Sequence, residues 1–496
     1  MTKNTSAIFF IMVVILGKIT GFGKDLLLSY HHGAAELTDA FFIANSLASL
    51  FYASLYLSVP AIIIPYYTRV IDKLNDAHYQ TELYSVCQSF VVLSVILSVS
   101  VFIYAESLVQ LSFSEISYDT EKTAIRFLKI ISLTFCFSTI VALFNALQVV
   151  NGSKFLSFIV PVVNNLTFIV SLLIFTRASD FINILWAGLF GWLFLCVVNA
   201  YYSAGLISFK FTASLPLFTK KSLLVIFLPA LIAFYIEQIN GYISIFFASG
   251  LGEGAVSVIS YANKINLIVV SVFMVFLNVY IFPKLASSRF EKQGEGVEVF
   301  SSVIFKWILI LSVPLAFILY IYANPIISLL FERGEFNKSD ALSVASVLSI
   351  LSLSLPLLLI RDLLNRIVFS FENTSITMLS LMISVAIHGV FSFYLSREYG
   401  LNGVAIAFVL SAFVNVVVLF IFLRIYFDIR LLSRNLKDVI ICFLSLFLSV
   451  VLSFIIFGWV DIGWVLESVF LCISYLMFLY FLGSEEIRII LLKLSL

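Results

Sequence analysis

Charged residues are scarce in this chain. Only 11% of its 496 residues are Asp, Glu, Lys or Arg, whereas soluble globular proteins carry about 25%. The sequence has 4 histidines and 5 cysteines, and the cysteines lie singly in apolar segments without a CxxC pair. This composition excludes an ordinary soluble domain. The cysteine spacing argues against a disulfide framework and against a cysteine-bound metal.

Long apolar segments make up most of the sequence. Hydrophobic residues account for 62% of the chain, and the mean hydropathy is +1.11. A helix needs about 20 apolar residues to cross a hydrocarbon core of about 30 Å. Such runs predict an all-α polytopic membrane protein with about fourteen transmembrane helices, the first of which begins soon after Lys3 and is not a cleaved signal. The approximate limits of these spans are 7–30, 38–66, 83–105, 122–149, 154–176, 182–208, 222–249, 256–283, 302–323, 340–370, 375–396, 401–426, 434–458 and 463–483.

Basic residues are concentrated in alternate loops between these spans. Short loops rich in Lys and Arg stay on the cytoplasmic side of a membrane. The richer set predicts which loops are cytoplasmic, and an even number of spans then places both termini inside. The residues of that set are Arg69, Lys73, Lys154, Lys210, Lys220, Lys221, Lys284, Arg289, Lys292, Arg424, Arg430 and Arg434.

The sequence contains an internal repeat. Three pairs of landmarks keep one constant spacing along the chain: Tyr104 and Tyr322, Pro65 and Pro283, and Ala44 and Ala262. Because six is an even number of spans, the two halves have the same orientation and are expected to form two parallel six-helix repeats around a central cavity. The predicted domains are an N-terminal lobe (1–215), a C-terminal lobe (216–430) and two extra transmembrane helices (431–496) that form a groove for a lipid tail.

Several charged residues fall inside the predicted spans. A charge at the centre of a bilayer costs at least about 2.5–3.5 kcal/mol on insertion scales, so each must face a cavity or a partner. We expect Lys18, Lys24 and Lys264 to line the cavity and to bind an anion. The full set is Lys18, Lys24, Asp25, Asp39, Glu237, Lys264, Arg361, Asp362 and Arg366.

Alternative interpretations of these charges stay open at this point. Lys24 with Asp25, and Arg361 with Asp362, could lie near span ends and reach the headgroups. Asp39 is either a carboxylate that starts its helix or a counter-ion or switch residue, and Asp25 is a candidate counter-ion for the lysines. Glu237 either binds a coupling cation or belongs to a polar seam.

Five short segments carry a likeness to a known family. They are 17–25 (GKITGFGKD), 38–42 (TDAFF), 252–257 (GEGAVS), 261–264 (YANK) and 330–336 (LFERGEF). These segments resemble the MurJ/MviN lipid II flippases, which belong to the multidrug/oligosaccharidyl-lipid/polysaccharide exporter superfamily. The likeness runs from residue 7 to about residue 430, and the family also has fourteen spans.

The resemblance implies a V-shaped pair of six-helix lobes with a cationic cavity and a groove for a polyprenyl chain. The family's basic positions fall on Lys18, Lys24 and Lys264, and its acidic position falls on Asp39. The family usually has Arg where this chain has Lys, and a further Arg expected near Tyr52 is missing. Lys offers a point charge and lacks the planar fork with which Arg binds a diphosphate.

From these observations we expect a flippase that moves lipid II, an undecaprenyl-diphosphate-linked glycan, to the outer leaflet by alternating access. A carrier of another lipid-linked oligosaccharide, such as a capsule or O-antigen unit, and a multidrug cation antiporter are the alternatives. We expect no enzymatic activity and no metal or other cofactor, with coupling to Na⁺, H⁺ or the membrane potential. The expected setting is a bacterial inner membrane, with the chain as a monomer that contacts membrane lipids and no nucleic acid.

Overall fold

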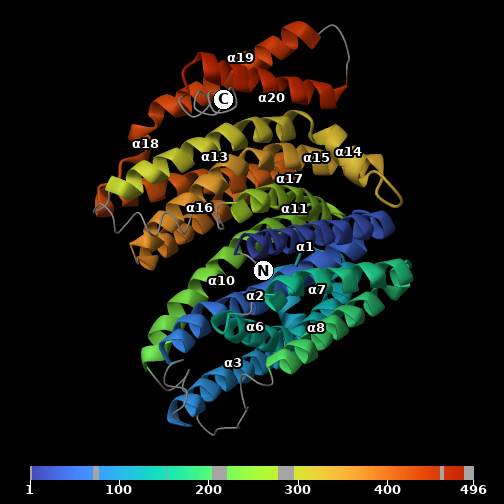
Figure 1. The fold of residues 1–496 in the computed structure, drawn as a ribbon. Coiled ribbons are helices and arrows are strands. Elements are labelled where there is room, and N and C mark those ends of the chain that lie inside the picture. The colour runs from blue at the N-terminus through green and yellow to red at the C-terminus, as the bar shows by residue number, and fades with distance from the viewer. Residues whose placement is uncertain are drawn as a thin grey trace. The chain divides into compact units, whose positions relative to one another are not determined.

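The computed structural model describes residues 3–70, 77–152, 155–203, 221–276, 295–371, 373–457 and 463–484. The regular structure in these segments is helical, which confirms the predicted fold class (Figure 1). The first half contains α1 (Lys3–His32), α2 (Glu36–Val70), α3 (Ala77–Ile103), α4 (Ala105–Ser112), α5 (Tyr118–Ser132), α6 (Thr134–Val150), α7 (Phe155–Ile174), η2 (Ala178–Asp180) and α8 (Phe181–Ser203). The second half contains α10 (Lys221–Ser249), α11 (Ala255–Phe276), α13 (Glu295–Ile321), α14 (Ala323–Phe331), α15 (Lys338–Ser352), α16 (Ser354–Ser370), α17 (Thr374–Phe427), α18 (Leu431–Arg434), α19 (Leu436–Phe457) and α20 (Trp464–Phe481).

Most of these helices have the length and composition of membrane spans. Within the described segments, ten helices are long and apolar enough to cross a bilayer, or eleven if α15 and α16, which are bent by 43° to each other, form one broken span. The protein is therefore a multi-pass membrane protein. The total of fourteen spans stays a prediction, as does the orientation of the termini, because many of the basic loop residues lie outside the described residues.

Helix α17 contains two of the predicted spans. Its backbone breaks at Gly400, which has φ 57° and ψ −135°. Hydrogen bonds join the segments on either side of this break. Ser384 Oγ donates to the carbonyl of Ser411 at 3.0 Å, and Asn415 Nδ2 donates to the carbonyl of Ser380 at 3.5 Å. The two arms therefore run antiparallel, as the separate spans predicted at 375–396 and 401–426 require.

The helix breaks repeat along the chain. Tyr104 separates α3 from α4, and Tyr322, its counterpart among the sequence landmarks, separates α13 from α14. Leu133 and Leu353 separate the next helix pairs, and both have φ −65° and ψ −21°. The structure thus contains the internal repeat. One of the sequence landmarks, Pro283, lies outside the described residues.

The described residues form two compact units. Unit 1 comprises Met1–Ser260 and Arg333–Asp340, and unit 2 comprises Tyr261–Glu332 and Ala341–Leu496. The predicted lobe boundary at 215/216 lies outside the described residues, so the three predicted domains stay a prediction.

The last two helices pack on α13 inside unit 2. Lys306 Nζ on α13 lies 3.4 Å from the Asp438 carboxylate on α19. Beyond the other end of α13, the Tyr322 hydroxyl donates to Glu467 Oε2 on α20 at 2.6 Å. Between these contacts the apolar core of unit 2 includes Tyr475 of α20. The helix pair is therefore held at both ends.

Candidate functional site

Helix α1 carries two of the lysines predicted to bind an anion. Lys18 is exposed, and Lys24 is partly buried. Lys24 Nζ lies 3.8 Å from Asp25 Oδ1 and 5.4 Å from the centre of the Phe168 ring on α7. Asp25 is only 6% exposed. Lys24 is thus held by a buried carboxylate and an aromatic face, whereas Lys18, almost two turns earlier, is open.

Small residues let α1 pack closely on α7. A Cβ atom at Gly21 would lie 3.2 Å from Asn165 Nδ2, which is tighter than ordinary contact. The same amide nitrogen donates to the carbonyl of Gly17 at 3.1 Å. The glycines therefore bring a polar side chain of α7 against the α1 backbone next to Lys18, as expected of small residues at helix interfaces in membranes.

Asp39 joins equivalent helices of the two repeats. It lies in the first turn of α2, but its carboxylate binds the N-terminal end of α11. The backbone N–H groups of Gly254 and Ser257 donate to its two oxygens at 2.7 Å each, and the Ser257 hydroxyl also donates to it. Asp39 is 4% exposed. We call this set of hydrogen bonds the Asp39 clamp.

The clamp follows from two features of local physics. The first N–H groups of a helix have no partner within the helix, and the helix dipole favours a negative charge there. Hydrogen bonds to a carboxylate are about twice as strong as neutral ones. Asp39 therefore caps a helix that begins in the other half of the chain.

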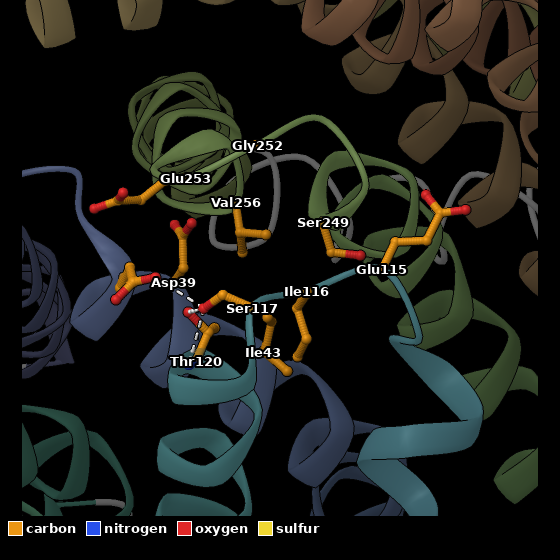
Figure 2. A pocket seen from close by; sticks show the side chains of 11 residues that line it. Asp39, Ile43, Glu115, Ile116, Ser117, Thr120, Ser249, Gly252, Glu253 and Val256 are labelled. Carbon is orange, nitrogen blue, oxygen red and sulfur yellow. Dashed lines mark hydrogen bonds between the residues drawn. The ribbon is translucent and has the colours of Figure 1, made fainter.

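A cavity of about 350 Å³ opens beside the clamp, inside unit 1 (Figure 2). Four of its lining residues are acidic. The hydroxyl of Ser117, which caps α5, donates to Glu36 at 2.8 Å and ties α5 to the start of α2. The cavity is not suited to a diphosphate, so it is distinct from the predicted anion site. Its lining consists of Glu36, Asp39, Ile43, Glu115, Ile116, Ser117, Thr120, Ser249, Gly252, Glu253 and Val256.

The remaining predicted site residues are placed separately. Lys264 is partly buried on α11 in unit 2, whereas Lys18 and Lys24 belong to unit 1. Glu237 is an exposed residue of α10. Among the described residues, no three His, Cys, Asp or Glu side chains come together in a way that could hold a metal ion.

Aromatic residues surround Tyr52, where the family resemblance predicted a further basic residue. Tyr52 on α2 stacks on Phe135 of α6, with ring centres 5.6 Å apart and planes 21° apart. One turn later, Tyr56 meets Trp192 of α8 edge to face at 6.0 Å. This part of α2 is therefore closed by aromatic packing and adds no cation to the site.

Sequence reasoning missed the partners of Asp39. Ser257 follows Asp39 at the same spacing that separates the landmarks of the internal repeat, such as Ala44 and Ala262. Equivalent positions of two repeats related by a two-fold axis can meet only near that axis. The repeat spacing was therefore the sequence signal from which the contact between Asp39 and Ser257 could have been predicted.

Comparison with known proteins identifies the family. The model of the family described as lipid II flippase MurJ matches residues 28–479. The chain belongs to the MurJ lipid II flippase family. A probable lipid II flippase MurJ from Aquifex aeolicus (strain VF5) is 24% identical over 419 residues, which cover 82% of this chain and 81% of the relative. A MurJ homologue from Bdellovibrio bacteriovorus is 32% identical over 199 residues, covering 40% of this chain and 38% of the homologue.

Solved structures show the same fold. A lipid II flippase MurJ in an inward closed conformation matches with a TM-score of 0.79 and 20% identity, covering 95% of this chain and 98% of that one. An inward-facing multidrug transporter of the MATE family and MOP superfamily matches with a TM-score of 0.69 and 15% identity, covering 85% and 98%. MurJ proteins are flippases, and thus transporters rather than enzymes.

Proposed function

We propose that this chain is a flippase that moves lipid II from the cytoplasmic leaflet to the outer leaflet by alternating access. The observation that carries the proposal is the match of the MurJ family model to residues 28–479. We further propose a bacterial inner membrane as its setting, with both termini on the cytoplasmic side and the chain acting as a monomer.

Lys18, Lys24 and Lys264 bind the diphosphate in this proposal. Lys24 supports it because its distance of 3.8 Å from Asp25 is longer than a hydrogen bond of about 2.7–2.9 Å between such charges. The ammonium group therefore keeps donors for a phosphate, while the Asp25 carboxylate balances its charge when no substrate is bound. Lys18 is exposed on the same helix and offers a second cation.

The Asp39 clamp is the switch of the transport cycle. It closes the ends of α2 and α11 that are predicted to face outward. When the head group leaves toward the outside, these ends must separate, and the N–H groups of Gly254 and Ser257 then bond to water. The clamp therefore stabilises the outwardly closed state. The size of this stabilisation is the free-energy difference between the hydrogen bonds to Asp39 and those that the same N–H groups make to water.

The lipid tail lies along α19 and α20. These helices expose large apolar side chains that include Phe447, Phe454 and Ile473. They are fixed to α13 by Lys306–Asp438 and by Tyr322–Glu467. A surface of this kind suits a polyprenyl chain that stays in the bilayer while the head group crosses.

The membrane potential is the proposed driving force. Moving an anionic head group outward across an inside-negative membrane gains about 2.3 kcal/mol per charge per 100 mV. Coupling to Na⁺ or H⁺ would need a carboxylate that binds the ion, and Glu237 is the candidate for that role. Replacing Glu237 with Gln should leave potential-driven flipping intact, and loss of flipping would assign the coupling to this residue.

The test is the exposure of a lipid-linked glycan in liposomes that hold the purified full chain. Lipid II is compared with a capsule-type repeat unit on the same undecaprenyl diphosphate, with and without an inside-negative potential. We expect exposure of lipid II that increases with the potential. Exposure of only the capsule-type unit would show that the chain carries another glycan, and exposure of neither would contradict the proposal.

A further inference from the structure

Helix α16 in unit 2 carries an arginine that the proposed mechanism does not use. Arg361 lies nine residues before Ser370, the last residue of α16, so it is about 14 Å from that helix end at about 1.5 Å per residue. Its Nε atom is buried and has no hydrogen-bond partner. The placement two and a half turns inside the helix disfavours the interpretation that Arg361 reaches the headgroups from a span end.

The other charges of α16 satisfy each other. Arg366 Nε donates to Asp362 Oδ2 at 2.8 Å, which forms an ion pair one turn apart on the same helix. No such partner is present for Arg361 within the described residues. An unpaired guanidinium in a membrane helix is costly, and such residues face a bundle interior or a water-filled path and mark a substrate or ion site.

The orientation of Arg361 follows from a neighbouring contact. Asn266 Nδ2 on α11 donates to Ser354 Oγ on α16 at 3.0 Å. Ser354 therefore faces α11. At about 100° per residue, Arg361 lies within about 20° of Ser354 around the helix. The guanidinium thus continues the face of α16 that carries Ser354 and its hydrogen bond with α11.

Asn365 adds a second unsatisfied group to this face. It follows Arg361 by one turn, and its Oδ1 atom is buried without a donor. The face thus presents one donor group that lacks an acceptor and one acceptor that lacks a donor. A phosphate supplies only acceptors. A sugar diphosphate supplies phosphate oxygens for Arg361 and a hydroxyl or acetamido N–H for Asn365.

The first repeat has the asparagine of this pair, likewise with a buried Oδ1 atom that lacks a donor, but not the arginine. In the register set by the matching breaks at Leu133 and Leu353, Arg361 corresponds to Val141 and Asn365 corresponds to Asn145. Val141 is fully buried among apolar side chains. The guanidinium is therefore a property of the second repeat alone and not a structural requirement of the repeated fold.

We infer that Arg361 and Asn365 form a binding subsite for the sugar diphosphate of the substrate, in which Arg361 grips the phosphate and Asn365 binds the first sugar. This inference rests on the proposed function and deepens it. Lys264 lies two residues before Asn266, so it faces about 160° away from the α11 side that meets α16. The subsite is therefore a contact additional to Lys264. It supplies the planar fork that Lys18, Lys24 and Lys264 lack.

The test measures binding to the full chain in detergent with four probes. The probes are short-chain lipid II, the same lipid diphosphate without sugar, the lipid monophosphate, and phosphatidylglycerol as a bulk anionic lipid. We expect Arg361→Gln to weaken both diphosphate ligands roughly ten-fold or more, as the loss of a charge-assisted bidentate contact would. The lipid monophosphate offers Arg361 only one phosphate group and should lose less affinity than the diphosphate ligands. Affinity for phosphatidylglycerol should change by less than about two-fold, because a bulk anionic lipid is attracted by the remaining charges of Lys18, Lys24 and Lys264.

Two further variants separate binding from folding. Arg361→Lys keeps the charge and should recover only part of the diphosphate affinity. Asn365→Ala should weaken lipid II and leave the sugar-free diphosphate unchanged. The matched control, Asp362→Asn with Arg366→Gln, removes the ion pair of the same helix and should leave all four affinities unchanged.

The outcomes are distinguishable from failure of the proposed function. If the wild-type chain binds lipid II and Arg361→Gln binds it equally well, the subsite is disproved while the flippase proposal stands. An equal loss for all four anions would also overturn the subsite, since it would show a general effect of charge. If the wild-type chain does not bind lipid II, the proposed function itself fails, and the subsite fails with it.

Discussion

The first and second repeats break their helices at matching positions but carry different chemistry there. Tyr104 and Tyr322 interrupt equivalent helices, yet only the Tyr322 hydroxyl reaches a carboxylate, that of Glu467, among the described residues. Asp39 of the first repeat binds Ser257, its counterpart in the second. The duplicated backbone thus carries different side chains at comparable places: the carboxylate of the clamp, Asp39, lies in the first repeat, and the unpaired Arg361 lies in the second.

Replacing Asp39 with serine, the residue at the equivalent position of the second repeat, should have the largest effect on transport. Asp39→Ser places the residue of the second repeat in the first and removes the charged acceptor of two N–H groups. Hydrogen bonds to charged groups contribute about 1.5–3 kcal/mol each, so the clamped state should weaken by several kcal/mol and flipping should be lost. The measurement is thiol labelling of a cysteine placed at Ser249, which lines the adjacent cavity.

The control for the clamp is Ser257→Ala. This variant removes the hydroxyl but keeps the backbone N–H bonds, so labelling at position 249 should rise far less than in Asp39→Ser. Equal labelling in wild type and Asp39→Ser would show that the clamp does not hold α2 and α11 together.

The second prediction concerns Gly400, at which α17 reverses its direction. In the first repeat, the equivalent reversal is made by a six-residue link between α7 and α8. Gly400 has φ 57° and ψ −135°, a conformation that is essentially restricted to glycine. A Cβ atom added at position 400 meets no atom within 4 Å. The effect of Gly400→Ala therefore comes only from the backbone conformation. We expect a loss of about 1–3 kcal/mol in the free energy of unfolding, measured by denaturation in detergent.

Gly241 provides the matched control for that strain. It lies inside α10 and a Cβ there also meets no atom within 4 Å. Gly241→Ala should be neutral or stabilising by up to about 1 kcal/mol, since alanine favours a helix. Equal destabilisation by both variants would contradict the account of the reversal.

The smallest expected effect concerns the tyrosines at the helix breaks. Tyr322→Phe removes the hydrogen bond to Glu467 and should lower the free energy of unfolding by about 1–2 kcal/mol. Tyr104→Phe, the equivalent change in the first repeat, removes the hydroxyl of a residue that is 61% exposed. It should change stability by less than about 0.5 kcal/mol, and equal losses would remove the distinction between the two breaks.

Much of the fold could be predicted from hydropathy. The runs of apolar residues located the helices, and the landmarks at Tyr104 and Tyr322 predicted the repeat that the structure contains. The bend between α15 and α16 had one signal in the sequence, because Pro356 lies three residues after Leu353 and cannot donate a backbone hydrogen bond to residue 352. The equivalent break at Leu133 has neither Pro nor Gly within three residues and could not be predicted. Such a bend depends on packing against other helices, which a single sequence does not specify.

The site was predictable as a set of residue types but not as a set of contacts. Lys24 and Asp25 are neighbours in the chain, so their pairing could be anticipated. The sequence alone does not decide whether Asp39 starts its own helix or acts as a switch, because its hydrogen-bond partners lie on α11. The unpaired state of Arg361 depends on which charges of α16 meet each other, and this is decided by side-chain geometry.

The most direct test of the account is lipid II flipping by proteoliposomes under an inside-negative potential, with Lys18, Lys24 and Lys264 all replaced by Gln. The unfolding temperature and the labelling at position 249 establish that the variant is folded and keeps the clamp. We expect the wild-type chain to expose lipid II at the outer leaflet and the triple variant not to expose it. Undiminished flipping by a folded triple variant would contradict this expectation.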